Sequence, residues 1–125
     1  MKSRVLVVDD SAYSRMSVKN VIIEAGYEVV GEAKTGEEAL DKISLLKPDI
    51  ITLDNILPDM TGIQVLQTLN HEKLPHCTIM ISAVGQQSAI EEAMSLGAKA
   101  YLIKPFSEEQ LLDELNLLYH ARNKP

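Results

Sequence analysis

Short apolar runs alternate with longer segments of helical periodicity along this chain. Runs rich in apolar and β-branched residues, which are typical of strands buried in a parallel sheet, predict strands at residues 5–8, 27–33, 50–53, 77–82 and 100–103. Between these runs, apolar side chains recur every three or four positions, which predicts helices. The apolar positions of the five helices span residues 16–25, 39–46, 63–69, 90–96 and 111–119.

Residue types at the ends of the helical segments predict where the helices begin and end. Ser11 is predicted to cap the first helix, and Gly26 supplies its C-terminal stop. Capping boxes, in which the first and fourth residues bond each other's backbone amides, are predicted at Thr35–Glu38 and Ser107–Gln110. The pair Lys47-Pro48 ends the second helix, because the residue before a proline is disfavoured in the helical conformation.

Strict alternation of strands and helices predicts an α/β fold with right-handed crossovers and helices on both faces of a parallel sheet. We expect a doubly wound, flavodoxin-like domain with five strands and five helices, and by analogy the strand order 2-1-3-4-5. The length of 125 residues fits one domain, so residues 1–125 are expected to form it, with a core of about 3–121 and a frayed tail at 122–125.

Composition excludes several classes of partner. The net charge of -6 gives no basic surface, so we expect neither nucleic acid nor an anionic membrane as a direct partner. No apolar run approaches the roughly 18 residues that a membrane span needs, the N-terminus is too short for a signal peptide, and the single cysteine, Cys77, forms no internal disulfide. A cytoplasmic location is expected. His71, His76 and His120 have no metal-ligand spacing and are predicted to be surface residues.

Chemically active side chains follow four of the predicted strands, at the point where each strand ends. They are Asp9 and Asp10, Asp54, Ser82, and Lys104. Taken singly, each is compatible with a cap, a turn or a strand terminus. Because the carboxyl ends of parallel strands meet at one edge of the sheet, where ligands bind in this class of fold, their combination predicts a site.

Three neighbouring carboxylates repel one another and need a compensating cation. Oxygen ligands without thiolate or imidazole favour Mg²⁺, for which Mn²⁺ can substitute. A lysine and a hydroxyl beside an acidic cluster suit an incoming phosphoryl group, so the sequence predicts that Asp54 is a nucleophile that forms an aspartyl phosphate.

Together these motifs resemble the response-regulator receiver domain. The resemblance rests on Asp9-Asp10, on Asp54 followed by Pro58 and Gly62, on Ser82-Ala83, and on residues 97–106, and it covers about Ser3 to Ala121. The stretch 82–87 makes the chain most similar to the stand-alone chemotaxis members of the family.

The resemblance implies a role for each site residue. Asp54 matches the position phosphorylated by a sensor histidine kinase. Asp10, Asp54 and the backbone carbonyl of Ile56 match direct Mg²⁺ ligands, and Asp9 matches the residue that holds the metal largely through water. Lys104 matches the lysine that contacts the phosphoryl oxygens, and its bond to Pro105 is expected to be cis.

The resemblance also implies a conformational switch. Ser82 matches the hydroxyl that follows the phosphoryl group, and Tyr101 matches an aromatic residue whose ring turns inward in response. The surface that binds partners would comprise the fourth helix, the fifth strand and the fifth helix. Ile56 and Val84 are apolar at positions where some relatives carry polar side chains. This difference predicts that the aspartyl phosphate has a different lifetime from that in a relative with polar groups there.

The expected function is that of a monomeric, stand-alone response regulator that catalyses its own phosphorylation and dephosphorylation and binds a flagellar motor-switch protein or another downstream protein. Alternatives are a phosphorelay shuttle that passes its phosphate to a histidine phosphotransfer protein, and a receiver that binds protein without phosphorylation. A metal-dependent phosphohydrolase is disfavoured by the missing Asp-x-Asp arrangement. A nucleotide or flavin binder is disfavoured because acids replace the phosphate loop after the first strand.

Overall fold

Five strands and five helices alternate in the computed structural model, which describes residues 3–122. The strands are β1 (Arg4–Val8), β2 (Glu28–Ala33), β3 (Ile50–Leu53), β4 (Thr78–Ser82) and β5 (Ala100–Ile103). The helices are α1 (Ala12–Glu24), α2 (Gly36–Leu46), α3 (Gly62–His71), α4 (Gln87–Ser95) and α5 (Glu108–Arg122). The predicted elements are confirmed, with several termini shifted by a residue or more.

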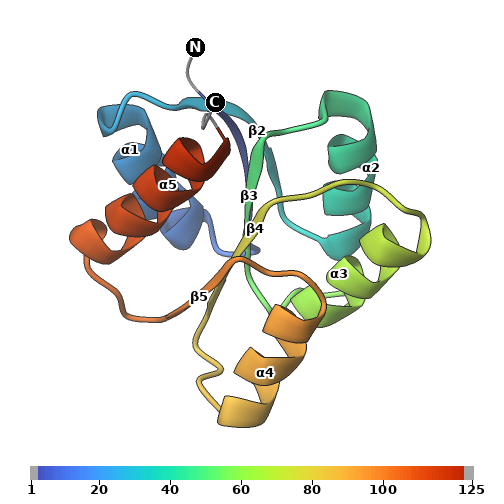
Figure 1. The fold of residues 1–125 in the computed structure, drawn as a ribbon. Coiled ribbons are helices and arrows are strands. Elements are labelled where there is room, and N and C mark those ends of the chain that lie inside the picture. The colour runs from blue at the N-terminus through green and yellow to red at the C-terminus, as the bar shows by residue number, and fades with distance from the viewer. Residues whose placement is uncertain (1–2, 123–125) are drawn as a thin grey trace.

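The strands form one parallel sheet in the order β2-β1-β3-β4-β5, which confirms the predicted doubly wound topology. Helices α1 and α5 cover one face of the sheet, and α2, α3 and α4 cover the other (Figure 1). The chain therefore reverses its direction of winding at β1 and β3, and the carboxyl ends of these two central strands lie side by side.

Side chains at alternating positions of the strands pack into two separate hydrophobic cores, one on each face of the sheet. In β1, Val5 and Val7 pack with α1 and α5, whereas Leu6 and Val8 pack with the helices of the opposite face. All four are essentially inaccessible to solvent, since they expose at most 2% of their surface. Burial on both faces explains why β1 is a continuous apolar run from Val5 to Val8.

Capping differs in detail from the prediction. Ser11 caps α1 as expected, and the box at Ser107–Gln110 is reciprocal, with side chains of both residues accepting the other's amide. At Thr35–Glu38 only the threonine half forms, because the Glu38 carboxylate accepts instead from the amide of Lys34. A full capping box at Thr61–Gln64, which was not predicted from the sequence, caps the N-terminus of α3.

Helix C-termini end where the sequence indicates. Lys47 adopts the left-handed conformation at the end of α2, with φ of 49°, and Gly97 follows α4 with φ of 101°. Helix α5 continues to Arg122, the first residue of the expected tail, and residues 123–125 lie outside the described part. Among residues 3–122, no helix combines the length and apolar character that a membrane crossing requires.

His76 is half-buried, so it lies at the surface, as expected, only in part. Its ring nitrogens lie 3.0 Å from Thr78 Oγ1 and 3.0 Å from Asn70 Oδ1. The Asn70 amide nitrogen donates to the Leu96 carbonyl, which orients its oxygen toward the histidine. The Nε2 of His76 therefore carries the proton, and the imidazole joins α3, β4 and the end of α4.

The half-buried His76 predicts a loss of stability in mild acid. Burial, reinforced by the charge of Lys99, lowers the pKa of His76 below its ordinary value of about 6.5. The unfolded chain then binds a proton at a higher pH than the folded chain, so the contribution is complete above about pH 6.5 and is lost as the pH falls below it. Urea unfolding at pH 7.5 and 5.5 is expected to show this loss of stability in the unaltered protein and a smaller loss in His76→Gln. His71→Gln, which changes an exposed histidine, is the control. A loss in His76→Gln as large as that of the unaltered protein would contradict the assignment of the effect to His76.

Candidate functional site

Three aspartates meet at the carboxyl ends of β1 and β3. Val8 and Leu53 are paired across the two strands, and the Asp54 amide donates to the Val8 carbonyl at 3.0 Å. Carboxylate oxygens of Asp9, Asp10 and Asp54 all lie within 4.8 Å of one another. The structure thus brings together the three acids that the sequence analysis singled out.

Lys104 supplies the positive charge in this cluster. It follows β5, and its Nζ lies 2.8 Å from Asp9 Oδ2 and 3.0 Å from Asp54 Oδ2. Burial opposes the charge on this lysine, but the hydrogen bonds that it donates to Asp9 and Asp54 outweigh burial and raise the pKa of Lys104. The lysine is therefore held as a cation between two acids, and the Lys104-Pro105 bond is cis, as predicted.

Burial makes the charge of Asp54 costly. It exposes 6% of its surface, and its Oδ1 accepts from the Ile56 amide at 3.0 Å. Burial and the charge of Asp9 raise the pKa of Asp54, against the opposing effects of the Ile56 amide and Lys104. Paired carboxylates at this separation repel by about 3 kcal/mol at an effective dielectric constant of 20, and one lysine compensates three of them only in part.

The donor atoms in this cluster fit a hard divalent cation. All three side chains offer carboxylate oxygens, and no cysteine or histidine of the described residues joins them. Such a set favours Mg²⁺, which binds through one or two carboxylates and retains several waters. Asp10 is exposed at the rim, so the cluster is open on that side. We conclude that the residues present suit the predicted metal.

The loop between β3 and α3 is fixed from both of its ends. The side-chain oxygen of Asn55 accepts from the Ile63 amide at 3.1 Å, and its carbonyl accepts from Gly62 at 2.8 Å. At the far end, Asp59 accepts from the amides of Gly36 and Glu37, which lowers the pKa of Asp59. Asn55 is 7% exposed and was not among the predicted site residues. Its only sequence signal is an amide side chain directly after Asp54.

Ser82 and Tyr101 are connected through the turn that follows β4. Ser82 is fully buried, and its Oγ accepts from the Val84 amide at 3.1 Å. The Tyr101 hydroxyl donates to the Val84 carbonyl, and burial raises the pKa of Tyr101. The Lys104 amide donates to the Ser82 carbonyl at 2.9 Å, so Ser82 at the end of β4 lies beside the end of β5, which leads into Lys104. The turn therefore couples a buried hydroxyl to the aromatic residue.

Comparison with known proteins identifies the family. Residues 5–116 match the response regulator receiver domain. The chain belongs to this family. Receiver domains bind Mg²⁺ at an acidic pocket, and this receiver has a cluster of three aspartates.

Chemotaxis proteins are among the relatives of this receiver. It is 44% identical to the chemotaxis protein CheY of Thermotoga maritima over 93% of this chain and 97% of that protein. It is 39% identical to CheY of Bacillus subtilis over 93% and 97% of the two chains. Both alignments span nearly the full length of the relatives, so this receiver is CheY-like.

Solved structures agree with this assignment. The response regulator domain of Thermotoga maritima CheB is 36% identical and superposes with a TM-score of 0.86, covering 100% of this chain and 99% of that one. A CheX-CheY-BeF₃-Mg²⁺ complex from Borrelia burgdorferi gives 30% identity and a TM-score of 0.86 over 94% and 89%. The flavodoxin-like fold predicted from the sequence is confirmed.

Proposed function

We propose that this receiver is a phosphorylation-controlled signalling switch in which Asp54 accepts a phosphoryl group from a sensor histidine kinase. The observation that carries the proposal is the position of Asp54, whose carboxylate lies within 4.8 Å of carboxylate oxygens of two further acids and 3.0 Å from the Lys104 ammonium. Asp10, Asp54 and the Ile56 carbonyl would hold Mg²⁺, with Asp9 acting largely through water. A bound Mg²⁺ would supply the positive charge that draws phosphoryl oxygens toward the acids.

The reaction needs little from the protein beyond positioning and charge. A carboxylate oxygen of Asp54 attacks phosphorus, so a P–O bond forms while the P–N bond of the phosphohistidine breaks and its electron pair stays on the imidazole nitrogen. The Ile56 amide fixes one carboxylate oxygen of Asp54 and thereby its direction of attack. Lys104 neutralises phosphoryl charge. Water later attacks the same phosphorus, which releases phosphate and restores the carboxylate.

The output would be a rearrangement of the turn after β4. When Ser82 bonds a phosphoryl oxygen, its contact with the Val84 amide changes, and Val84 also accepts from Tyr101. A change at this turn therefore reaches the surface of α4, β5 and α5, where a flagellar motor-switch protein or another downstream protein would bind. The bond between Tyr101 and Val84 favours a switch over a phosphorelay shuttle. In this proposal the receiver acts as a monomer in the cytoplasm.

Ile56 is expected to influence the lifetime of the aspartyl phosphate. Ile56 is 56% exposed, it stands two residues after Asp54 and its amide bonds the Asp54 carboxylate, so an apolar residue borders the acid cluster. A polar side chain there could orient attacking water. We expect Ile56→Asn to change the dephosphorylation rate severalfold, measured as phosphate release from the purified phosphoprotein. An unchanged rate would show that Ile56 does not influence the lifetime of the aspartyl phosphate.

Intact-mass analysis tests the proposed function. After incubation with acetyl phosphate and Mg²⁺, the protein is expected to gain the mass of one phosphoryl group. Asp54→Asn and a metal-free sample should both lose the adduct. No adduct on the unaltered protein, together with no response to beryllofluoride, would show that the acid cluster is structural and that partners bind constitutively.

A further inference from the structure

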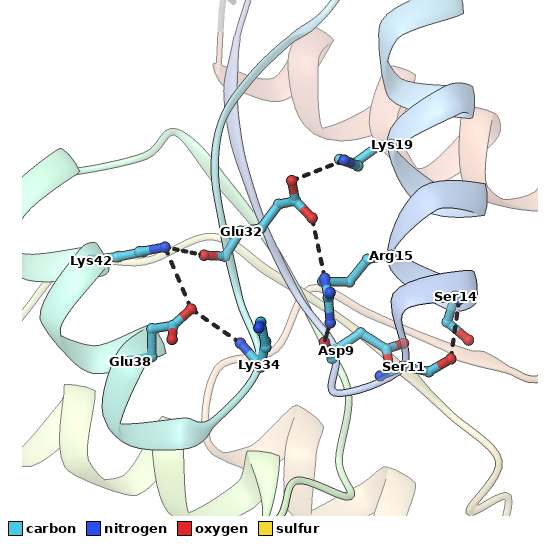
Figure 2. Close-up of polar contacts among 9 residues, drawn as sticks. All are labelled: Asp9, Ser11, Ser14, Arg15, Lys19, Glu32, Lys34, Glu38 and Lys42. Atoms are coloured by element: carbon cyan, nitrogen blue, oxygen red, sulfur yellow. Dashed lines mark hydrogen bonds and ion pairs between the residues drawn. The ribbon is translucent and has the colours of Figure 1, made fainter.

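An alternating chain of charges runs from the acid cluster to the surface of α1 and β2. Arg15 donates through Nη1 to the Asp9 backbone carbonyl at 2.8 Å and through Nε to Glu32 Oε1 at 3.1 Å. The second oxygen of Glu32 accepts from Lys19 at 2.8 Å. Figure 2 shows Arg15 lying between Asp9 and Glu32, with Lys19 beyond them. None of these three charged residues belongs to the predicted site.

The bonds of Arg15 fix the peptide that joins the two acids. The Asp9 amide donates to the Ala33 carbonyl at 3.0 Å, and its carbonyl accepts from Arg15, so both of its backbone polar groups are held. Within residues 3–122 the Asp10 carboxylate has no hydrogen-bond or ion-pair partner of its own. Its position therefore depends on the backbone, and the Asp9-Asp10 peptide is the part of the backbone that Arg15 orients.

Glu32 determines where the Arg15 charge points. The Arg15 side chain exposes only 11% of its surface, so water screens its charge poorly. The hydrogen bond of Lys19, with that of Arg15, outweighs burial and lowers the pKa of Glu32, so Glu32 is ionised at neutral pH. Without that negative charge, the guanidinium would be drawn to the nearby Asp9 and Asp10 carboxylates and would compete with a cation there.

We propose that Arg15 and Glu32 are positioning residues for the divalent-cation site. Arg15 orients the Asp9-Asp10 peptide so that the Asp10 carboxylate faces the other two acids, and Glu32 keeps the Arg15 charge away from them. The inference rests on the proposed function, because it takes the three aspartates to be the metal site. Outer groups that orient metal ligands typically change metal affinity by about 10- to 100-fold when they are removed.

Mg²⁺ binding, measured by isothermal titration calorimetry on the unphosphorylated protein, tests the pair. We expect Arg15→Lys and Glu32→Gln each to weaken Mg²⁺ binding by about tenfold. Lysine keeps the charge but lacks the fork that reaches both partners at once. The matched control is Glu38→Gln, since the Glu38 side chain is 39% exposed against 38% for Glu32 and also pairs with a lysine. That variant should bind Mg²⁺ like the unaltered protein.

A double variant distinguishes positioning from a general loss of structure. If Glu32 acts through Arg15, then Glu32→Gln added to Arg15→Lys should weaken binding by much less than the product of the two single effects. Affinities within twofold of the unaltered protein in both single variants, or effects that multiply, would overturn the inference. Absence of Mg²⁺ binding to the unaltered protein would instead overturn the proposed metal site itself.

Discussion

Gly62→Ala is expected to destabilise the protein by about 2 to 3 kcal/mol, the upper part of the range for overpacking a filled site. A Cβ at this position would lie 2.6 Å from the Asp54 carbonyl oxygen and 3.0 Å from Asn55 Cα. Both atoms belong to the backbone, so no side-chain rotation relieves the contact. The loop that carries Asp54 must move, and phosphorylation should slow together with the loss of stability.

Gly36→Ala is the matched control for this substitution. Gly36 and Gly62 each follow a threonine N-cap and are each the first residue of a helix. The three heavy atoms nearest to a Cβ at position 36 all belong to the Met60 side chain, which can change its rotamer as a backbone atom cannot. Urea unfolding of the two variants should therefore give a clearly larger loss for Gly62→Ala. Equal losses would contradict the close approach of α3 to the Asp54 backbone.

Lys104→Met is expected to make stability depend on Mg²⁺. Methionine keeps much of the side-chain length and removes the charge that compensates Asp9 and Asp54, which expose 4% and 9% of their side chains. Removing one partner of a buried ion pair costs about 3 to 5 kcal/mol. Because the lysine is 24% exposed, we expect about 2 to 3 kcal/mol at pH 7 without metal. Most of this loss should disappear when Mg²⁺ occupies the acids.

The measurement is urea unfolding with EDTA and with saturating Mg²⁺. Lys99→Met serves as the control, because it removes the same charge from an exposed position outside the cluster. It should show no such Mg²⁺ dependence. On the proposed function, Lys104→Met should also slow labelling by acetyl phosphate by about 100-fold, the effect of removing one donor from a preorganised anionic site. A variant as stable as the unaltered protein in EDTA would show that Lys104 does not compensate the acids.

The alternation of strands and helices and the location of the site could be predicted from local sequence patterns, whereas the strand order was inferred by analogy. Strands buried on both faces are continuous apolar runs, and each of the runs at Val5–Val8 and Ile50–Leu53 stops at an acid. Parallel pairing then brings those acids to one edge. The reciprocal box at Ser107–Gln110 was equally local, since its two partners are three residues apart.

Features that depend on distant contacts could not be predicted in the same way. His76 becomes half-buried only when Asn70 and Thr78 close around it. Arg15 and Glu32 are 17 residues apart and meet only when β2 lies beside β1. The box at Thr61–Gln64 is different, because its spacing is visible in the sequence and was therefore predictable.

Trapping the acyl phosphate tests the central claim most directly. Borohydride reduces an aspartyl phosphate to homoserine, so the modified position can be found by peptide mass spectrometry after acetyl phosphate and Mg²⁺ treatment. We expect homoserine at position 54, no conversion of Asp9 or Asp10, and none in a sample without Mg²⁺. Homoserine at position 9 or 10, or none at any position, would contradict the assignment of Asp54 as the phosphoacceptor.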